Sequence, residues 1–115
     1  MKFGLRRIIV FSRDVPALAT WYSSVFGMKV REMDPSGGWA DLDGGGCSLG
    51  LHGGGSRRTG DCGHKIVFGA KDVSRARAVL VKRGARLGPV KKFAGLHLCD
   101  GHDPEGNVLQ ISNRV

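Results

Sequence analysis

Two cationic residues, Arg7 and Lys65, occupy matching positions in two similar stretches of this 115-residue chain. A guanidinium binds a carboxylate or phosphate through two parallel hydrogen bonds, and an ammonium adds a compact positive charge. If both side chains face one cleft, they predict a site for the anionic group of a small molecule. One or both could instead point to solvent, or pair with Asp41, Asp43 or Asp100. Strand register decides between these outcomes, because a shift of one residue turns every side chain to the opposite face.

Three more residues are candidates for shaping the same ligand site. Gln110 stands between two apolar residues of an extended run, so its amide should face away from them. There it would either hydrogen-bond a ligand or be satisfied between two sheets. His52 shares a strand face with Gly50, and Trp39 aligns with Cys99 of the second stretch. The indole of Trp39 could form the floor of a pocket or pack in the core.

The histidines give little indication of metal chemistry. A metal site built from His52, His64 and a third ligand is conceivable, since imidazole binds several transition metals. The four histidines follow no ligand spacing, however, and such residues more often lie at the surface or in hydrogen bonds. No role as a metal ligand is predicted for His97 or His102. No nucleophile and base can be paired from spacing alone, so no catalytic residue is predicted.

The three cysteines indicate reduced thiols. Their number is odd and they form no CxxC pair, whereas the disulfide framework of a secreted chain usually needs an even number. Cys47 and Cys99 fall in expected strands, where cysteine packs as a small apolar side chain. No apolar run approaches the roughly 18–20 residues that span a bilayer, and the N-terminus lacks a signal-peptide pattern. These features predict a cytoplasmic protein without a membrane partner.

The formal net charge of +8 favours anionic partners, whether nucleic acid, phosphate or carboxylate metabolites, or acidic protein surfaces. A nucleic-acid site would be expected to gather basic residues into a block interleaved with aromatic side chains. The basic residues are instead spread out as Arg6-Arg7, Arg57-Arg58, Arg75 and Arg77, Lys82-Arg83 and Lys91-Lys92. Nucleic-acid binding is therefore not the expected function.

The elements that would position these residues occur twice. The stretch RRIIVFSRDVPALATWYSSVFG, which begins at Arg6, aligns with HKIVFGAKDVSRARAVLVKRG, which begins at His64. A second pair, DGGGCSLGLH at 43–52 and DPEGNVLQIS at 103–112, shares an aspartate, a glycine and two apolar positions. This duplication predicts a single domain over 1–115, with module one at 1–52, a glycine-rich linker at 53–63 and module two at 64–115.

Each half of the sequence indicates a strand, a helix and three further strands. The opening strands are expected at Leu5–Phe11 and Lys65–Gly69, which are rich in β-branched residues. An aspartate should cap the start of each helix and a glycine its end, and these residues are Asp14, Asp72, Gly27 and Gly84. The remaining extended runs are expected at 28–33, 38–42 and 46–52, and at 86–92, 95–100 and 107–112.

The two helices should bury apolar stripes with helical spacing. The first stripe comprises Val15, Leu18, Ala19, Tyr22 and Phe26, and the second comprises Val73, Ala76, Val79 and Leu80. The basic residues of the second helix are expected on its solvent side, namely Arg75, Arg77, Lys82 and Arg83.

With these motifs the sequence resembles the vicinal oxygen chelate superfamily, which contains glyoxalases, bleomycin-resistance proteins and ring-cleaving dioxygenases. The resemblance covers nearly the whole chain and rests on RDVPALATWYSSVFGM, KDVSRARAVLVKRGARLGPV and, most specifically, DPEGNVLQIS. It implies an α+β, glyoxalase-like fold in which two tandem βαβββ modules form a curled mixed sheet around a cleft. It also implies a homodimer.

Metal-dependent members of that superfamily hold a divalent cation with ligands on the first and last strand of each module. The resemblance places those positions at Arg7, Gly50, Lys65 and Gln110. Arginine has no acceptor, lysine is an ammonium at neutral pH, glycine has no side chain and glutamine offers one neutral oxygen. We therefore expect the divalent-metal site of the family to be lost, with no cofactor bound.

The preferred interpretation is a metal-independent protein that binds an anionic small molecule, nearest in type to the drug-sequestering members of the family. In it, Arg7 and Lys65 hold the anionic group, and Gln110, His52 and Trp39 shape the pocket. One alternative is a metal-dependent lyase or dioxygenase relative that uses ligands other than those of the family. Another is a basic interaction module for nucleic acid or an acidic partner. The unsuitable ligand set favours binding over catalysis.

Overall fold

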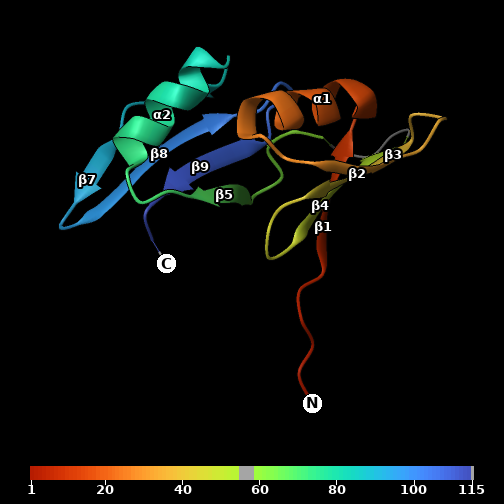
Figure 1. Cartoon of the computed structure of the whole chain (residues 1–115), viewed down its shortest axis with the longest axis horizontal. Helices are drawn as coiled ribbons and strands as arrows, with labels where there is room; N and C mark the ends of the chain where they lie inside the picture. Colours follow the sequence, from red (N-terminus) through yellow and green to blue (C-terminus); the bar gives the residue numbers. More distant parts are fainter. Residues whose placement is uncertain (55–58, 115) are drawn as a thin grey trace. The chain divides into compact units, whose positions relative to one another are not determined.

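The computed structural model of the protein describes residues 1–54 and 59–114. The chain forms two compact units, Met1–Thr59 and Gly60–Val115, and each is described by itself (Figure 1). Part of the predicted linker at 53–63 lies outside the described residues, as does the basic pair Arg57-Arg58. In the described ranges, no helix is long and apolar enough to cross a membrane.

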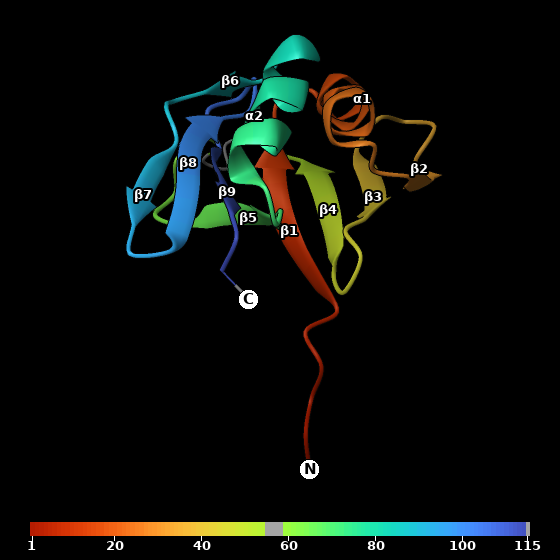
Figure 2. The same ribbon diagram turned by 60° about the vertical axis from the view of Figure 1, so that its left-hand side comes forward.

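Among the residues described, the first unit is a four-stranded mixed sheet with one helix. Its elements are β1 (Arg7–Ser12), α1 (Val15–Phe26), β2 (Val30–Met33), β3 (Trp39–Asp43) and β4 (Ser48–Gly53). The strand order is β1-β4-β3-β2, with β1 parallel to β4 and the other neighbours antiparallel. Figure 2 shows β1, β4 and β3 side by side in this order. The parallel pair joins the two ends of the module, so residues far apart in sequence share one surface.

The second unit repeats this plan in its own described residues. Its elements are β5 (Lys65–Gly69), α2 (Val73–Lys82), β6 (Arg86–Leu87), β7 (Lys91–Phe93), β8 (Leu96–His102) and β9 (Val108–Ser112). The strand order is β5-β9-β8-β6, with β5 parallel to β9 and with β7 also paired to β8. The predicted α+β class, built from two strand–helix–strand modules, is therefore confirmed.

The single strand expected at 86–92 is wrong, because the structure divides it into β6 and β7. The N–H of Gly88 still donates to the carbonyl of Asp100 at 2.7 Å, so the pairing continues one residue beyond β6. Pro89 then offers no N–H to a strand ladder, which interrupts the pairing until Lys91.

Both helices begin at the predicted aspartates, and α1 ends at the predicted Gly27, whereas the C-cap of α2 is Arg83 and the predicted Gly84 is the residue after it. The carboxylates of Asp14 and Asp72 each accept a hydrogen bond from the backbone N–H three residues ahead, at 3.1 and 3.0 Å. After α1, Gly27 adopts a left-handed conformation with φ of 70°, and after α2 Gly84 has φ of 104°. Glycine tolerates such angles without the steric cost of a side chain, so these local rules fix where each helix stops.

The core of the first unit lies between α1 and one face of its sheet. The buried residues of α1 are Val15, Leu18, Ala19, Tyr22 and Val25, and the helix packs against β3 and β4. Phe26, the last member of the predicted stripe, is half-buried, and Val25 takes its place in the core.

The predicted stripe of α2 is correct only in part. Val73 and Leu80 are buried, but Val79 is 41% exposed. Arg77, which was expected on the solvent side, is half-buried and donates to the carbonyls of Gly88 at 2.6 Å and Leu87 at 2.9 Å. The helix is thus turned so that an arginine, rather than a valine, covers the connection that follows β6.

Candidate functional site

The open face of the first sheet, which points away from α1, carries most of the predicted site residues. Alternate residues of β1 are buried on the helix side, so the others must lie on the open face. Strand pairing then fixes which residues of β4 and β3 lie beside them. The open-face residues are Arg7, Ile9 and Phe11 of β1, Ser48, Gly50 and His52 of β4, and Trp39, Asp41 and Asp43 of β3.

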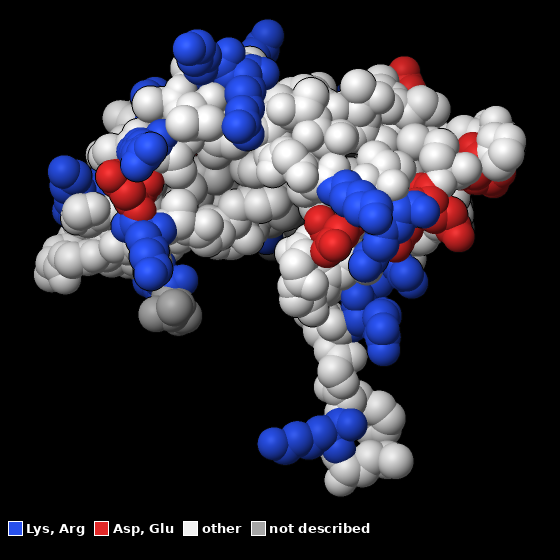
Figure 3. All heavy atoms as spheres, in the orientation of Figure 1, with Lys and Arg blue, Asp and Glu red and all other residues white. Residues whose placement is uncertain are grey.

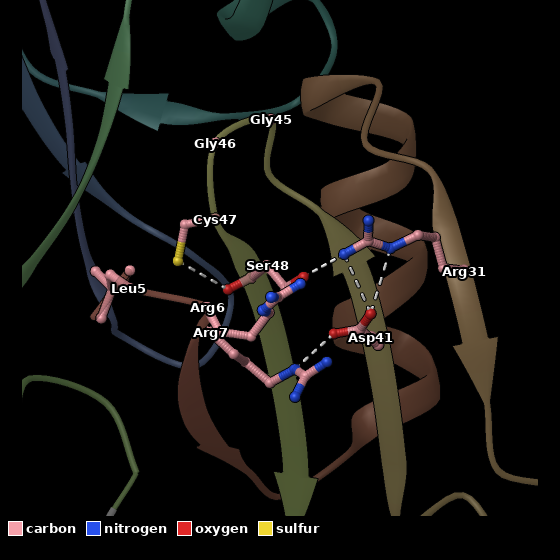
Figure 4. Close-up of a pocket in the computed structure, with 10 residues that line it drawn as sticks. Leu5, Arg6, Arg7, Arg31, Asp41, Gly45, Gly46, Cys47 and Ser48 are labelled. Carbon is pink, nitrogen blue, oxygen red and sulfur yellow. Dashed lines mark hydrogen bonds and ion pairs between the residues drawn. The ribbon is translucent and has the colours of Figure 1, made fainter. Parts of the chain in front are cut away.

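Asp41 is the centre of a charged network on this face (Figure 4). Its Oδ1 accepts a hydrogen bond from Nε of Arg7 at 2.9 Å, and its Oδ2 accepts one from Nε of Arg31 at 3.3 Å. Arg31 also donates from Nη2 to the hydroxyl of Ser48. The side chain of Asp41 is 10% exposed, whereas those of Arg7 and Arg31 are 37% and 42% exposed. Two guanidinium groups therefore enclose the carboxylate while remaining in contact with solvent.

The space beside Gly50 is taken by neighbouring side chains. A Cβ atom at this position would lie 2.6 Å from Cη2 of Trp39 and 3.0 Å from Cδ of Arg7. The guanidinium of Arg7 also lies over the indole, with its Cζ 5.6 Å from the ring centroid, where cation–π attraction operates. A longer side chain at position 50 would have to displace the indole of Trp39, which itself is half-buried on the open face.

His52 completes a small aromatic group on this face. Its ring makes edge-to-face contacts with Phe11 and Trp39, with centroid separations of 5.7 and 6.1 Å. Its Nδ1 is buried and has no hydrogen-bond partner among the described residues. Buried nitrogens without a partner are uncommon in proteins, so Nδ1 of His52 is an exception within the described structure.

The second unit carries an ion pair of its own. Nζ of Lys65 lies 2.9 Å from Oδ1 of Asp100, and Nε2 of Gln110 donates to the same oxygen at 3.0 Å. Partial burial raises the pKa of Asp100, but the hydrogen bonds from Lys65 and Gln110, with the charges of Lys65 and Lys91, outweigh it and leave the pKa below its ordinary value. The side chains of Lys65 and Asp100 are 48% and 33% exposed, so this pair is more open to water than the pair in the first unit.

Strand register shows that the two ion pairs are equivalent. Asp41 lies opposite Gly50, and Asp100 lies opposite Gln110 at the matching place in the second sheet. Each predicted cation therefore pairs with an aspartate on the strand that runs antiparallel to the last strand of its own module, β3 or β8, one of the alternatives that the sequence left open. The structure brings Arg7 together with Trp39 and His52, and it brings Lys65 together with Gln110.

The predicted alignment of Trp39 with Cys99 is wrong by one residue. Trp39 lies opposite His52 on the open face, and the matching residue is Leu98, which lies opposite Ser112. Cys99 is fully buried in β8, where burial raises the pKa of its thiol. Because neighbouring strand residues point to opposite faces, the error of one residue exchanged a core position for a site position.

The four positions that hold metal ligands in the resemblance do not fit a divalent cation here. Arg7 and Lys65 present positive charges that are already paired, and the space at Gly50 is filled by the Trp39 indole. Gln110 turns its NH₂ group toward Asp100. In the part of the chain that the structure describes, no group of three or more His, Cys, Asp or Glu residues could hold a metal ion.

Two members of the charged network, Arg31 and Ser48, had no recognisable signal in the sequence. The pairing of β2 with β3 shifts register between Val30 and Glu32, which leaves Arg31 as an extra residue. Such a bulge redirects a side chain, and here the Arg31 side chain reaches Asp41 and Ser48. An arginine in a short, exposed strand gives no hint of this from its neighbours.

Comparisons with known proteins agree with this fold. The family model described as Glyoxalase/Bleomycin resistance protein/Dioxygenase superfamily matches residues 4–111. A comparison of the sequence with curated proteins found no match.

Solved structures with similar folds cover nearly the whole chain. A glyoxalase/bleomycin resistance protein/dioxygenase family enzyme from Burkholderia phytofirmans PsJN is 23% identical over 98% of this chain and 100% of its own, with a TM-score of 0.81. TioX from Micromonospora sp. ML1 is 20% identical over 98% and 100%, with a TM-score of 0.80. Lactoylglutathione lyase from Agrobacterium tumefaciens is 18% identical over 96% and 93%, with a TM-score of 0.77. At these identities the similarity concerns the fold.

Proposed function

Since the chain belongs to the Glyoxalase/Bleomycin resistance protein/Dioxygenase superfamily, we propose that it is a metal-independent member that binds an anionic small molecule. On the open face of the first unit, Arg7 offers donors to the anionic group of a ligand, with Trp39 and His52 beside it. On the open face of the second unit, Lys65 offers the same charge, with Gln110 beside it. The protein acts by binding and not by catalysis.

The observation that carries this proposal is the replacement of metal-ligand positions by ion pairs in both modules. The Arg7–Asp41 and Lys65–Asp100 pairs, each 2.9 Å between charged atoms, keep a positive charge on each open face where a ligand of the metal would otherwise be. The outer N–H groups of the cations remain exposed and can donate to an incoming anion.

The proposal also includes assembly and location: the protein forms a homodimer, and it resides in the cytoplasm. Ile9 and Val67 lie at equivalent positions on the two open faces and are 49% and 56% exposed, which favours coverage by another protein surface. Cys47, Cys62 and Cys99 are all free thiols, as expected in a reducing compartment.

The alternatives from the sequence gain no comparable support. A metal-dependent lyase or dioxygenase relative would need a donor set, which the described residues do not provide. For a nucleic-acid or acidic-partner module, Figure 3 shows Lys and Arg spread over both units on the visible face, with no continuous basic patch there.

A screen of anionic metabolites, followed by titration of the best ligand with and without a metal chelator, tests the proposal. The double substitution Arg7→Met and Lys65→Met is expected to weaken binding at least about tenfold, because it removes two charge-assisted donors. The chelator is expected to have no effect.

The matched control is the double substitution Arg75→Met and Lys82→Met, which lowers the net charge equally on exposed positions of α2. It should change the affinity less than about twofold, since only long-range attraction is lost. Unchanged affinity in the Arg7→Met and Lys65→Met protein would remove both residues from the site.

A further inference from the structure

A pocket in the first unit, beside the start of β1 and β4, has a positively charged lining that suits an oxyanion. Its volume is about 510 Å³, and its walls include Arg6, Arg7, Arg31, Asp41, Cys47 and Ser48. In Figure 4 the side chains of Arg6 and Arg7 extend from the start of β1 toward Ser48 and Asp41, and Arg31 approaches from β2. Three guanidinium groups and one carboxylate give the lining a charge of three minus one, or +2.

Hydrogen-bond donors exceed acceptors in this pocket. Asp41 engages Nε of Arg7 and both Nε and Nη2 of Arg31, and Nη2 of Arg31 also donates to Ser48. Among the described residues this leaves Nη1 of Arg31 and the two Nη groups of Arg7 as donors without a partner. The side chain of Arg6 has no partner among the described residues, although its backbone carbonyl accepts from the N–H of Ser48 at 3.0 Å. That bond anchors Arg6 at the pocket while its guanidinium stays free.

The glycine-rich turn between β3 and β4 adds backbone donors to the same wall. Gly46 and Cys47 line the pocket, and within the described part of the chain their N–H groups have no hydrogen-bond partner. Exposed backbone N–H groups of a turn are well suited to anions, because they supply partial positive charge without a counter-ion.

We propose that this pocket binds a doubly charged tetrahedral oxyanion, as in the phosphate group of a phosphorylated metabolite. Two negative charges match the +2 lining, and the planar forks of arginine match pairs of phosphate oxygens. Leu5 is the one aliphatic side chain among the described residues of the wall, so the pocket offers little to a purely apolar ligand. The inference rests on the function proposed above only in that Arg7 belongs to both sites.

The inference is tested with inorganic phosphate, whose binding is measured from the broadening of its phosphorus NMR signal at constant ionic strength. Wild-type protein is expected to broaden the signal, and the substitution Arg6→Met to weaken binding about tenfold through loss of one guanidinium partner. Arg6 is exposed and its side chain unpaired in the described structure, so its replacement leaves the fold intact. Acetate at the same ionic strength should compete poorly, because it carries a single charge.

Two further variants, Arg75→Met and Lys65→Met, show whether a loss of phosphate binding is specific to the pocket. Arg75→Met makes the same charge change on α2 and should alter phosphate affinity less than about twofold. Equal weakening by Arg6→Met and Arg75→Met, or no broadening by wild-type protein, overturns the inference. If Lys65→Met weakens binding as much as Arg6→Met, the anion depends on Lys65 of the second unit and not on this pocket alone, which overturns the inference and leaves the proposed function standing. Weakening by Arg6→Met alone supports the pocket.

Discussion

Gly50→Glu is expected to destabilise the protein by about 2 kcal/mol and to create no metal site. The family resemblance implies a glutamate or histidine at this position in metal-using members. The Cβ atom of a glutamate here would lie 2.6 Å from the Trp39 indole and 3.0 Å from the Arg7 side chain, so the indole must move. Urea unfolding followed by circular dichroism measures the loss, and metal analysis of the purified variant shows whether a cation is bound.

Trp39→Ala provides the control for this prediction, because it removes the indole that a side chain at position 50 would contact. In a Trp39→Ala background only the flexible Arg7 side chain remains close to position 50, so Gly50→Glu should cost less than about 1 kcal/mol. The coupling between the two positions identifies the indole as the group that excludes a side chain. Equal losses in both backgrounds, or a stable Gly50→Glu protein that binds a divalent cation, contradict the account of this position.

Asp41→Asn is expected to cost about 2 kcal/mol in stability while it strengthens phosphate binding severalfold. Asp41 is 10% exposed and accepts hydrogen bonds from two guanidinium groups, so a neutral amide loses both charge-assisted bonds. The half-exposed arginines can rehydrate, which limits the loss. For a phosphate in the proposed pocket, the same change removes a competing anion and raises the charge of the lining by one.

Asp100→Asn provides the matched comparison, because Asp100 is the equivalent residue of the second module. The exposed Lys65–Asp100 pair should contribute less than about 1 kcal/mol, and its removal should leave phosphate affinity unchanged. Unfolding curves and phosphate titrations on both variants test this asymmetry. Equal stability losses for Asp41→Asn and Asp100→Asn, or weaker phosphate binding by Asp41→Asn, would show that Asp41 does not have the proposed role.

Local sequence rules predicted the elements of the fold well. Caps and stops depend on a single residue and its near neighbours, and Asp14, Asp72 and Gly27 therefore lie where the sequence placed them. The division of the 86–92 strand is also local in origin, since it follows from Pro89, which has no N–H to donate to a strand ladder.

The faces of the elements were harder to predict than their positions. Helical spacing defines a stripe but not the angle at which the sheet meets it, and for this reason Arg77 and Val79 exchanged their expected surroundings. The face of a strand residue was predicted where two-residue alternation suffices, as for Gln110 between its buried neighbours, but its role in binding stays a prediction. The contribution of Arg31 depends on a bulge in β2, which is decided by the pairing of distant strands and leaves no sign in the local sequence.

Metal analysis of protein purified without a histidine tag tests the central claim most directly, since that claim is the replacement of the family's metal ligands by ion pairs. After incubation with Ni²⁺, Zn²⁺, Mn²⁺ or Fe²⁺ and removal of excess metal, the account predicts less than roughly a tenth of an equivalent per chain, because the Arg7 and Lys65 cations repel a further positive charge. One equivalent of tightly bound metal, lost in Gly50 or Gln110 variants, would contradict it.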